Sequence, residues 1–198
     1  MFEAIRAKDP IAVQEIIELG GVDLDPPTQP YQVNKALAYA SIYGNLDIVK
    51  YILAQGVKVD GVVAYGGTAL LRAAEVQHND IVEFLIESGA NVNHPNSFGI
   101  SAMTGFAIIC NTRLLEMAIA NGGDINKSYK IQVSKSHGQL AYNPIQWAVV
   151  KGNTECVEFL AKNGANLDVL TRDGETLIEL AGIKNDERTF EEINKLIK

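Results

Sequence analysis

The sequence predicts an all-α protein built as a solenoid of stacked helix-turn-helix units, because one short pattern returns along the whole chain. The clearest copy spans residues 67–93. Leu70 and Ala73 lie on one face of a short first helix, and the apolar residues of 81–86 lie on one face of a second. Gly89 then ends the second helix. Two such short helices are marginal alone in water, so the unit needs copies of itself on both sides.

Two landmarks place these copies, and both recur with a period of about 33 residues. The alanine at 73 has a counterpart one period earlier at Ala40, and the pattern returns one period later at Phe106. The next counterpart, Ala148, follows after a longer step. The glycines that end the second helices keep the same register, with the same nine-residue excess, at Gly56, Gly89, Gly122 and Gly164. Agreement between two independent landmarks argues against a chance pattern.

A period of this length made of a turn and two helices resembles the ankyrin repeat, and the resemblance covers essentially the whole chain. Its most specific pieces are residues 89–93 (Gly-Ala-Asn-Val-Asn), residues 164–168 (Gly-Ala-Asn-Leu-Asp) and the paired alanines at 73 and 74. The chain departs from the family at the Thr-Pro-Leu-His tetrapeptide, which here reads Thr-Ala-Leu-Leu at 68–71 and Asn-Pro-Ile-Gln at 143–146. The histidine is absent throughout, so its hydrogen bonds must be replaced or lost.

The resemblance implies an ankyrin-repeat solenoid with β-hairpin fingers and terminal capping repeats, and predicts residues 1–198 as one such domain. The expected caps are about 1–27 and 171–198, and the expected repeats are about 28–60, 61–93, 94–138 with an extended finger, and 139–170. Three prolines between residues 22 and 32 predict a stiff extended loop. A Pro-rich ligand motif is the alternative interpretation of that loop.

The nine extra residues lie between positions 126 and 143. Tyr129 and Ile131 alternate with polar residues there, which predicts a lengthened β-hairpin finger. Residues 127–154 contain four lysines and no Asp or Glu, although the whole chain has a net charge of -7. We interpret this basic island as a site of electrostatic steering toward an acidic partner surface. A solvated loop without a role is the competing interpretation.

Composition and charge exclude several kinds of partner. An acidic chain lacks the basic face that phosphate backbones require, so nucleic acid is not expected. No apolar run approaches the ~20 residues that span a bilayer, so no membrane is expected. A helical pattern begins at once, without a secretory leader in the sequence as given. We therefore expect a cytoplasmic protein that is monomeric when free, or a periplasmic or secreted one if a leader was removed.

No motif in the sequence points to catalysis. Cys110 falls in an inter-helix turn and Cys156 at the start of a second helix, so both are interpreted as buried free thiols without a disulfide. The three histidines lack a second ligand at metal-binding spacing, and His78 is expected to have a structural role in a turn. No cofactor, metal site or catalytic residue is expected, and the chain is predicted not to be an enzyme.

The family resemblance also places the partner-binding surface on a concave face. In ankyrin proteins the contacting positions lie in the hairpin before each first helix and directly after the paired alanines. Carried over one residue at a time, with the basic finger added, the candidates are Tyr31, Tyr43, Tyr65, Val76, Phe98, Ile100, Ile108, Ile109, Lys130, Leu140, Tyr142 and Lys151. A contiguous apolar stripe on a surface marks an interaction site, unless the stack turns these side chains into its own core.

These observations predict a non-catalytic protein-binding module that binds one folded partner on its concave face. The partner is expected to be an enzyme with an acidic surface near the binding site. In a small stack of this family, binding is expected to inhibit or sequester that partner, as an enzyme inhibitor or immunity protein does. The alternatives are a scaffold or adaptor that links two proteins, a host-directed effector, and an enzyme whose site has no sequence signature.

Overall fold

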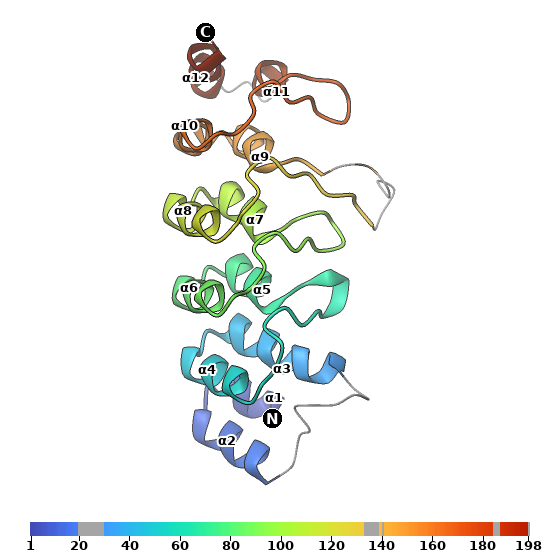
Figure 1. Cartoon of the computed structure of the whole chain (residues 1–198), viewed down its shortest axis with the longest axis vertical. Coiled ribbons are helices and arrows are strands. Elements are labelled where there is room, and N and C mark those ends of the chain that lie inside the picture. Colours follow the sequence, from blue (N-terminus) through green and yellow to red (C-terminus); the bar gives the residue numbers. More distant parts are fainter. Residues whose placement is uncertain (20–29, 133–138, 140, 184–186, 198) are drawn as a thin grey trace. The chain divides into compact units, whose positions relative to one another are not determined.

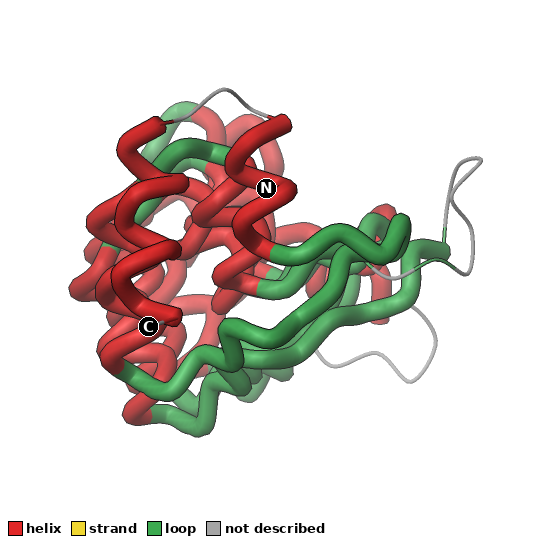
Figure 2. Tube along the Cα trace, turned by 90° about the horizontal axis from the view of Figure 1, so that it is seen from above, coloured by secondary structure: helices red, strands yellow, loops and turns green. Residues whose placement is uncertain are grey.

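The computed structural model describes residues 1–19, 30–132, 139, 141–183 and 187–197, with the backbone alone for 30–34. Regular structure in these residues is helical, and no strand occurs among them (Figure 2). The chain forms two compact units, Met1–Asn96 (unit 1) and Ser97–Lys198 (unit 2). Each unit consists of helix pairs joined by loops (Figure 1). The all-α helical repeat predicted from the period of the sequence pattern is confirmed.

The described residues of unit 1 form three helix pairs and one short 3-10 turn. These elements are α1 (Phe2–Arg6), α2 (Pro10–Glu18), α3 (Pro30–Tyr43), α4 (Leu46–Ala54), η1 (Ala64–Gly66), α5 (Ala69–Glu75) and α6 (Asn79–Glu87). The first helices α1, α3 and α5 pack in series, and the second helices α2, α4 and α6 pack in series beside them. Each helix therefore buries one face against its own pair and against the next pair.

Unit 2 repeats this arrangement. Its helices are α7 (Ala102–Ile109), α8 (Thr112–Ala120), α9 (Pro144–Val150), α10 (Thr154–Lys162), α11 (Leu177–Ile183) and α12 (Glu187–Ile197). The first helices α7, α9 and α11 pack in series, and α10 packs on α12. Only part of the apolar stripe of α12 is buried in the core. Ile193 is buried, whereas Phe190 is 38% exposed.

The core of each unit consists of the aliphatic stripes that the sequence pattern predicts. In unit 1 the side chains of Ile81, Leu85 and Ile86 are at most 1% exposed, as are Ile48 and Ile52 of the preceding second helix. Small residues occupy other buried positions of the first helices. Ala73 and Ala74 are buried, and their small side chains allow neighbouring helices to approach closely. Among the described residues, no helix combines the length and apolar character needed to cross a bilayer.

Hydrogen bonds within the tetrapeptide slot replace the missing histidine in two repeats. Gln146 Oε1 accepts from the Asn143 N–H at 3.0 Å, while Asn143 Oδ1 accepts from the Gln146 N–H at 3.0 Å. Thr176 and Glu179 make the same reciprocal capping box at the start of α11. Gln146 Nε2 also donates to the carbonyl oxygen of Leu170 at 2.9 Å, in the next loop. Gln146 thus supplies both the cap of α9 and a link to the loop that follows α10.

A second set of hydrogen bonds joins consecutive helix pairs. The residue before a second helix donates a side-chain hydrogen bond to a carbonyl oxygen of the preceding pair, in the pairs Asn45 to Lys8, His78 to Ile42 and Asn153 to Ile108. A main-chain carbonyl needs a hydrogen-bond donor. Each of these side chains provides that donor to a carbonyl near the end of a first helix. The predicted structural role of His78 is confirmed by this contact.

The structure corrects the prediction for the proline-rich loop. Residues 30–32 were expected in an extended segment, but α3 begins at Pro30. Proline suits the first turn of a helix, because its fixed φ is helical and its missing N–H would be unpaired there anyway. Tyr31 is therefore a helical residue and not part of a hairpin, and its side chain lies outside the described residues. The rest of that loop, 20–29, also lies outside them.

The predicted long finger is joined at its base. The Ile131 N–H donates to the Gln139 carbonyl at 2.8 Å, and the Ala141 N–H donates to the Tyr129 carbonyl at 2.8 Å. Residues 133–138 and Leu140 lie outside the described residues, so the hairpin itself stays a prediction. The division of the chain into one domain with four repeats and two caps also stays a prediction.

Candidate functional site

The ten predicted binding residues whose side chains are described all reach the surface. Tyr65 is 65% exposed, Phe98 48%, Val76 43% and Ile109 37%. The side chains of Tyr43, Ile100, Ile108 and Tyr142 are half-buried, and the two lysines, Lys130 and Lys151, are exposed. The competing interpretation placed these residues inside the core, yet none of the ten is buried. Tyr31 and Leu140 are not among the side chains that the structure describes.

Unit 1 has a groove beside its first helices, which we call the α3–α5 groove. It has a volume of about 310 Å³ and is lined by Lys35, Ala38, Tyr39, Ile42, Val63, Ala64 and Arg72. Its floor is apolar, and two cationic side chains flank it. The Lys35 Nζ lies 5.6 Å from the centroid of the Tyr39 ring, within cation–π range.

Arg72 is held in place by two contacts at the edge of the α3–α5 groove. Its Nη1 lies 2.8 Å from Glu75 Oε2, and its Nη2 donates to the Ala64 carbonyl at 3.0 Å. Gly67 provides the room, because a Cβ at this position would lie 2.7 Å from Arg72 Nη2. The guanidinium therefore ties the start of α5 to the 3-10 turn that carries Tyr65.

Tyr65 has an unusual backbone conformation. Its φ is 56° and its ψ is 28°, inside the left-handed region. A bulky residue is rare in this region, which costs roughly 1–2 kcal/mol for most side chains. The tyrosine is therefore held outward by a strained turn, and strain of this kind is found at binding sites.

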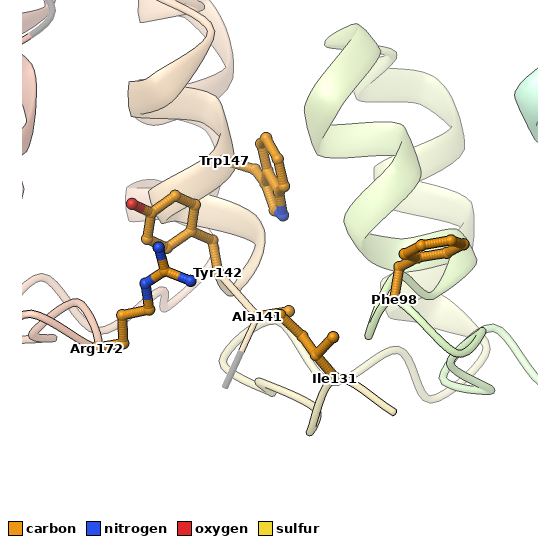
Figure 3. A pocket seen from close by; sticks show the side chains of 6 residues that line it. All are labelled: Phe98, Ile131, Ala141, Tyr142, Trp147 and Arg172. Atoms are coloured by element: carbon orange, nitrogen blue, oxygen red, sulfur yellow. The ribbon is translucent and has the colours of Figure 1, made fainter. Parts of the chain in front are cut away.

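Unit 2 has a smaller pocket, which we call the Trp147 pocket. Its volume is about 190 Å³, and its lining residues are Phe98, Ile131, Ala141, Tyr142, Trp147 and Arg172. Figure 3 shows these side chains arranged around the recess, with Trp147 on α9 and Ile131 and Ala141 on the two arms of the long loop. Tyr142 and Trp147 pack edge to face, with ring centroids 5.5 Å apart and an interplanar angle of 80°.

Charged groups surround the aromatic pair of the Trp147 pocket. Lys151 Nζ lies 5.8 Å from the Trp147 ring centroid. The Arg172 Nη1 donates to Gln139 Oε1 at 3.0 Å, and its Nε lies 3.3 Å from Asp173 Oδ2. Burial raises the pKa of the Tyr142 hydroxyl above its ordinary value, with a smaller contribution from the Glu175 carboxylate. The phenol is therefore neutral across the physiological range.

The indole nitrogen of Trp147 is a polar group without a partner. Its Nε1 atom is buried, and no hydrogen-bond acceptor lies within reach among the described residues. In Figure 3 this nitrogen points toward the side of the recess where Ala141 and Ile131 lie. A buried donor without an acceptor costs about 1–3 kcal/mol, so such atoms are few in native proteins.

Comparison with known families explains the repeat pattern. The family model described as ankyrin repeats (three copies) matches residues 1–96, and the ankyrin repeat model matches residues 142–172. The chain is an ankyrin repeat protein. A comparison with curated proteins found no match. Ankyrin repeats indicate a protein–protein interaction module, and proteins of this class are generally non-catalytic.

Three groove residues in these ankyrin repeats were missed by the sequence reasoning. Tyr39, Arg72 and Trp147 line the two recesses and occupy the same repeat position, directly before the landmark alanine. Each lies four residues before a predicted binding residue (Tyr43, Val76 and Lys151), and residues i and i+4 share one helix face. The i+4 rule could therefore have found them. Gly105 takes this position in the 94–138 repeat, where a Cβ would meet no atom within 4 Å.

The two cysteines are closer than their sequence positions suggested. Both are free thiols, Cys156 buried and Cys110 half-buried, so the prediction of two buried thiols is wrong for Cys110. The cause is local: Cys110 is the C-cap of α7 with a φ of 52°, which turns it out of the helix. Its thiol lies close enough to that of Cys156 for each to affect the pKa of the other. In the described part of the chain, no cluster of three or more His, Cys, Asp or Glu side chains could hold a metal ion.

Proposed function

We propose that this ankyrin repeat protein binds one folded partner protein on the face formed by its first helices and the loops before them, and that binding inhibits or sequesters the partner. The observation that carries the proposal is the exposure of large apolar side chains at positions where the fold does not need them. Tyr65 and Phe98 are the largest of these, and each lines a recess or lies close in sequence to a residue that does.

The energetics favour a few anchors within this face. Aromatic side chains at the centre of an interface can each contribute about 2 kcal/mol or more. The proposed surface comprises the twelve residues named from the sequence together with the linings of the α3–α5 groove and the Trp147 pocket. Exposed lysines at 127, 130 and 151 would steer a partner with an acidic surface, in a way that added salt weakens.

Several finer features belong to the same proposal. We infer that the loops before the first helices act as β-hairpin fingers and that the two ends of the chain act as capping repeats of one domain. Capping repeats shield the ends of such an array, so the free protein is proposed to be a monomer. Cytoplasmic location stays the default, or a periplasmic or secreted one if a leader was removed.

The proposal is tested with the full chain as bait and a Tyr65→Asn, Phe98→Ala double variant. Asn tolerates the left-handed conformation of residue 65, so this change removes the ring without adding strain. The matched control is Phe190→Ala, which removes a ring of similar exposure from α12. We expect one stoichiometric partner, whose activity falls on titration, with affinity lost only in the double variant. Equal affinity of the double variant and the control contradicts the placement of the surface.

A scaffold that links two proteins is the second candidate, favoured because each unit has a recess among its described residues. Two different partners bound at the same time, each sensitive to variants of one unit only, would support it. A single partner sensitive to changes at both Tyr65 and Phe98 would support the inhibitor.

A further inference from the structure

We propose that the Trp147 pocket binds one large apolar side chain, preferably aromatic, carried by an acidic surface segment of the partner. This inference rests on the proposed function and adds the chemistry of the bound segment. The pocket volume of about 190 Å³ decides the size of the occupant. Pockets for drug-sized molecules measure roughly 300–1,000 Å³, so this recess accommodates a single side chain and not a cofactor or metabolite of that size.

The lining of the pocket selects an apolar occupant. Phe98, Ile131 and Ala141 line one part of it, and the rings of Tyr142 and Trp147 line another. An aromatic side chain entering between such walls can stack against two ring systems, which adds to the gain from burial. A cationic occupant would lose its hydration there without an opposite charge inside the recess.

The charges around the pocket select acidic neighbours for that side chain. Lys130 directly precedes Ile131, Lys151 lies over Trp147, and Arg172 forms part of the wall. No carboxylate among the described residues pairs with Lys130 or Lys151, whereas Asp173 is engaged by Arg172. A guanidinium has five N–H donors, and Arg172 uses two of them for Gln139 and Asp173. Carboxylates beside the apolar residue would therefore complement three cationic side chains.

The indole N–H of Trp147 gives the pocket a preference for a segment that brings a hydrogen-bond acceptor. The Trp147 N–H is buried and lacks an acceptor among the described residues. A partner segment brings main-chain carbonyls and carboxylates, which accept hydrogen bonds. A small rotation of the indole as the apolar side chain enters would pair this donor and remove the cost of leaving it unpaired.

Trp147 is also the only tryptophan in the chain, so one signal reports on the pocket. The experiment follows the indole N–H resonance of the full-length, isotope-labelled protein by NMR. The probe is the peptide acetyl-Glu-Phe-Glu-amide, titrated to about 10 mM because a tripeptide is expected to bind with millimolar affinity. The comparison peptides are acetyl-Glu-Ala-Glu-amide, which lacks the ring, and acetyl-Lys-Phe-Lys-amide, which reverses the charge.

We expect a saturable shift with the Glu-Phe-Glu peptide. Loss of the ring should weaken binding about tenfold or more, from the apolar surface that is no longer buried. Arg172→Gln should weaken binding about two- to fivefold, as expected for one partly solvated charge. Arg188→Gln is the matched control, since Arg188 is an exposed arginine on α12 away from the lining, and it should leave the shift unchanged.

Three results would overturn the inference: no saturable shift, equal binding of the Phe and Ala peptides, or equal binding of the acidic and basic peptides. These outcomes are separable from failure of the proposed function. A partner still captured through Tyr65 and Phe98, with no peptide binding, would retain the function and reject this occupant. Peptide binding without any captured partner would retain this occupant and reject the proposed function.

Discussion

The imidazole of His78 donates from Nε2 to the carbonyl oxygen of Ile42, in the preceding helix pair, across 3.0 Å. A carbonyl can only accept, so the Nε2 atom carries the proton in this contact. The ring also lies directly over Gly44, because a Cβ on Gly44 would come within 2.5 Å of it. One turn residue therefore joins two helix pairs through a hydrogen bond and a close packing contact.

Replacing His78 tests the hydrogen bond. His78→Ala leaves the Ile42 carbonyl without its donor, and we expect a loss of about 0.5–1.5 kcal/mol in the free energy of unfolding. His78→Asn should recover part of the loss, since asparagine makes the equivalent bond at Asn45 and Asn153. Urea unfolding followed by circular dichroism gives both values. Equal stability of the Ala and Asn variants would mean that the bond contributes nothing.

Gly44→Ala tests the packing of the His78 ring. Gly44 has a φ of 71°, so an alanine there adds roughly 1–2 kcal/mol of strain, and the new Cβ also displaces the ring. Gly56→Ala is the control, because Gly56 has a φ of 85° but no atom lies within 4 Å of the position that its Cβ would take. The Gly44 variant should be less stable than the Gly56 variant by about 1 kcal/mol or more. Identical losses would show that only the backbone strain matters.

The capping box of α11 should make stability depend on pH. The N–H and hydroxyl of Thr176 hydrogen-bond the Glu179 carboxylate and lower its pKa. A lowered folded-state pKa adds stability above the unfolded value of about 4.3, and this is lost as the pH falls through the folded-state pKa. Glu179→Gln should therefore flatten the stability profile below about pH 4.3, measured by unfolding at a series of pH values. An unchanged profile contradicts the assignment.

The cysteine pair should react with alkylating reagents in a fixed order. Burial raises the pKa of the Cys156 thiol, and burial raises that of Cys110 as well. Only a thiolate is nucleophilic, so both should react slowly at mildly alkaline pH, and Cys156 should react only after unfolding. Mass spectrometry after iodoacetamide treatment of Cys110→Ala and Cys156→Ala variants measures each rate alone. Faster labelling of Cys156 in the folded protein would contradict the observed burial.

The sequence predicted the parts of this fold that depend on local pattern. The stripe at Ile81 and Leu85 and the stop at Gly89 depend on helix periodicity and a left-handed glycine, and both are observed. The start of α3 was missed, because three nearby prolines were interpreted as a loop although Pro30 suits a first helical turn. Neighbouring prolines do not by themselves distinguish these two roles.

The site was predicted less completely, because its residues come together through tertiary contacts. Tyr65 and Phe98 were predicted from the repeat register, that is, from their position within the repeating pattern of the sequence. Arg172 was not found, since it reaches the pocket from a loop in the repeat after that of Trp147. Trp147 was also missed, although it shares a helix face with Lys151. The proximity of Cys110 to Cys156 was missed for the same reason, because the repeat register predicted their places in the helix pairs but not the distance between the two thiols.

The empty position at Gly105 offers an experimental opportunity. It takes the place that Tyr39, Arg72 and Trp147 hold in the other repeats, and a Cβ there would meet no neighbouring atom. A cysteine introduced at this position in a Cys110→Ala background would have an uncrowded Cβ from which to carry a fluorescent dye or spin label. Such a label would record the arrival and departure of a partner in real time while leaving every proposed anchor intact.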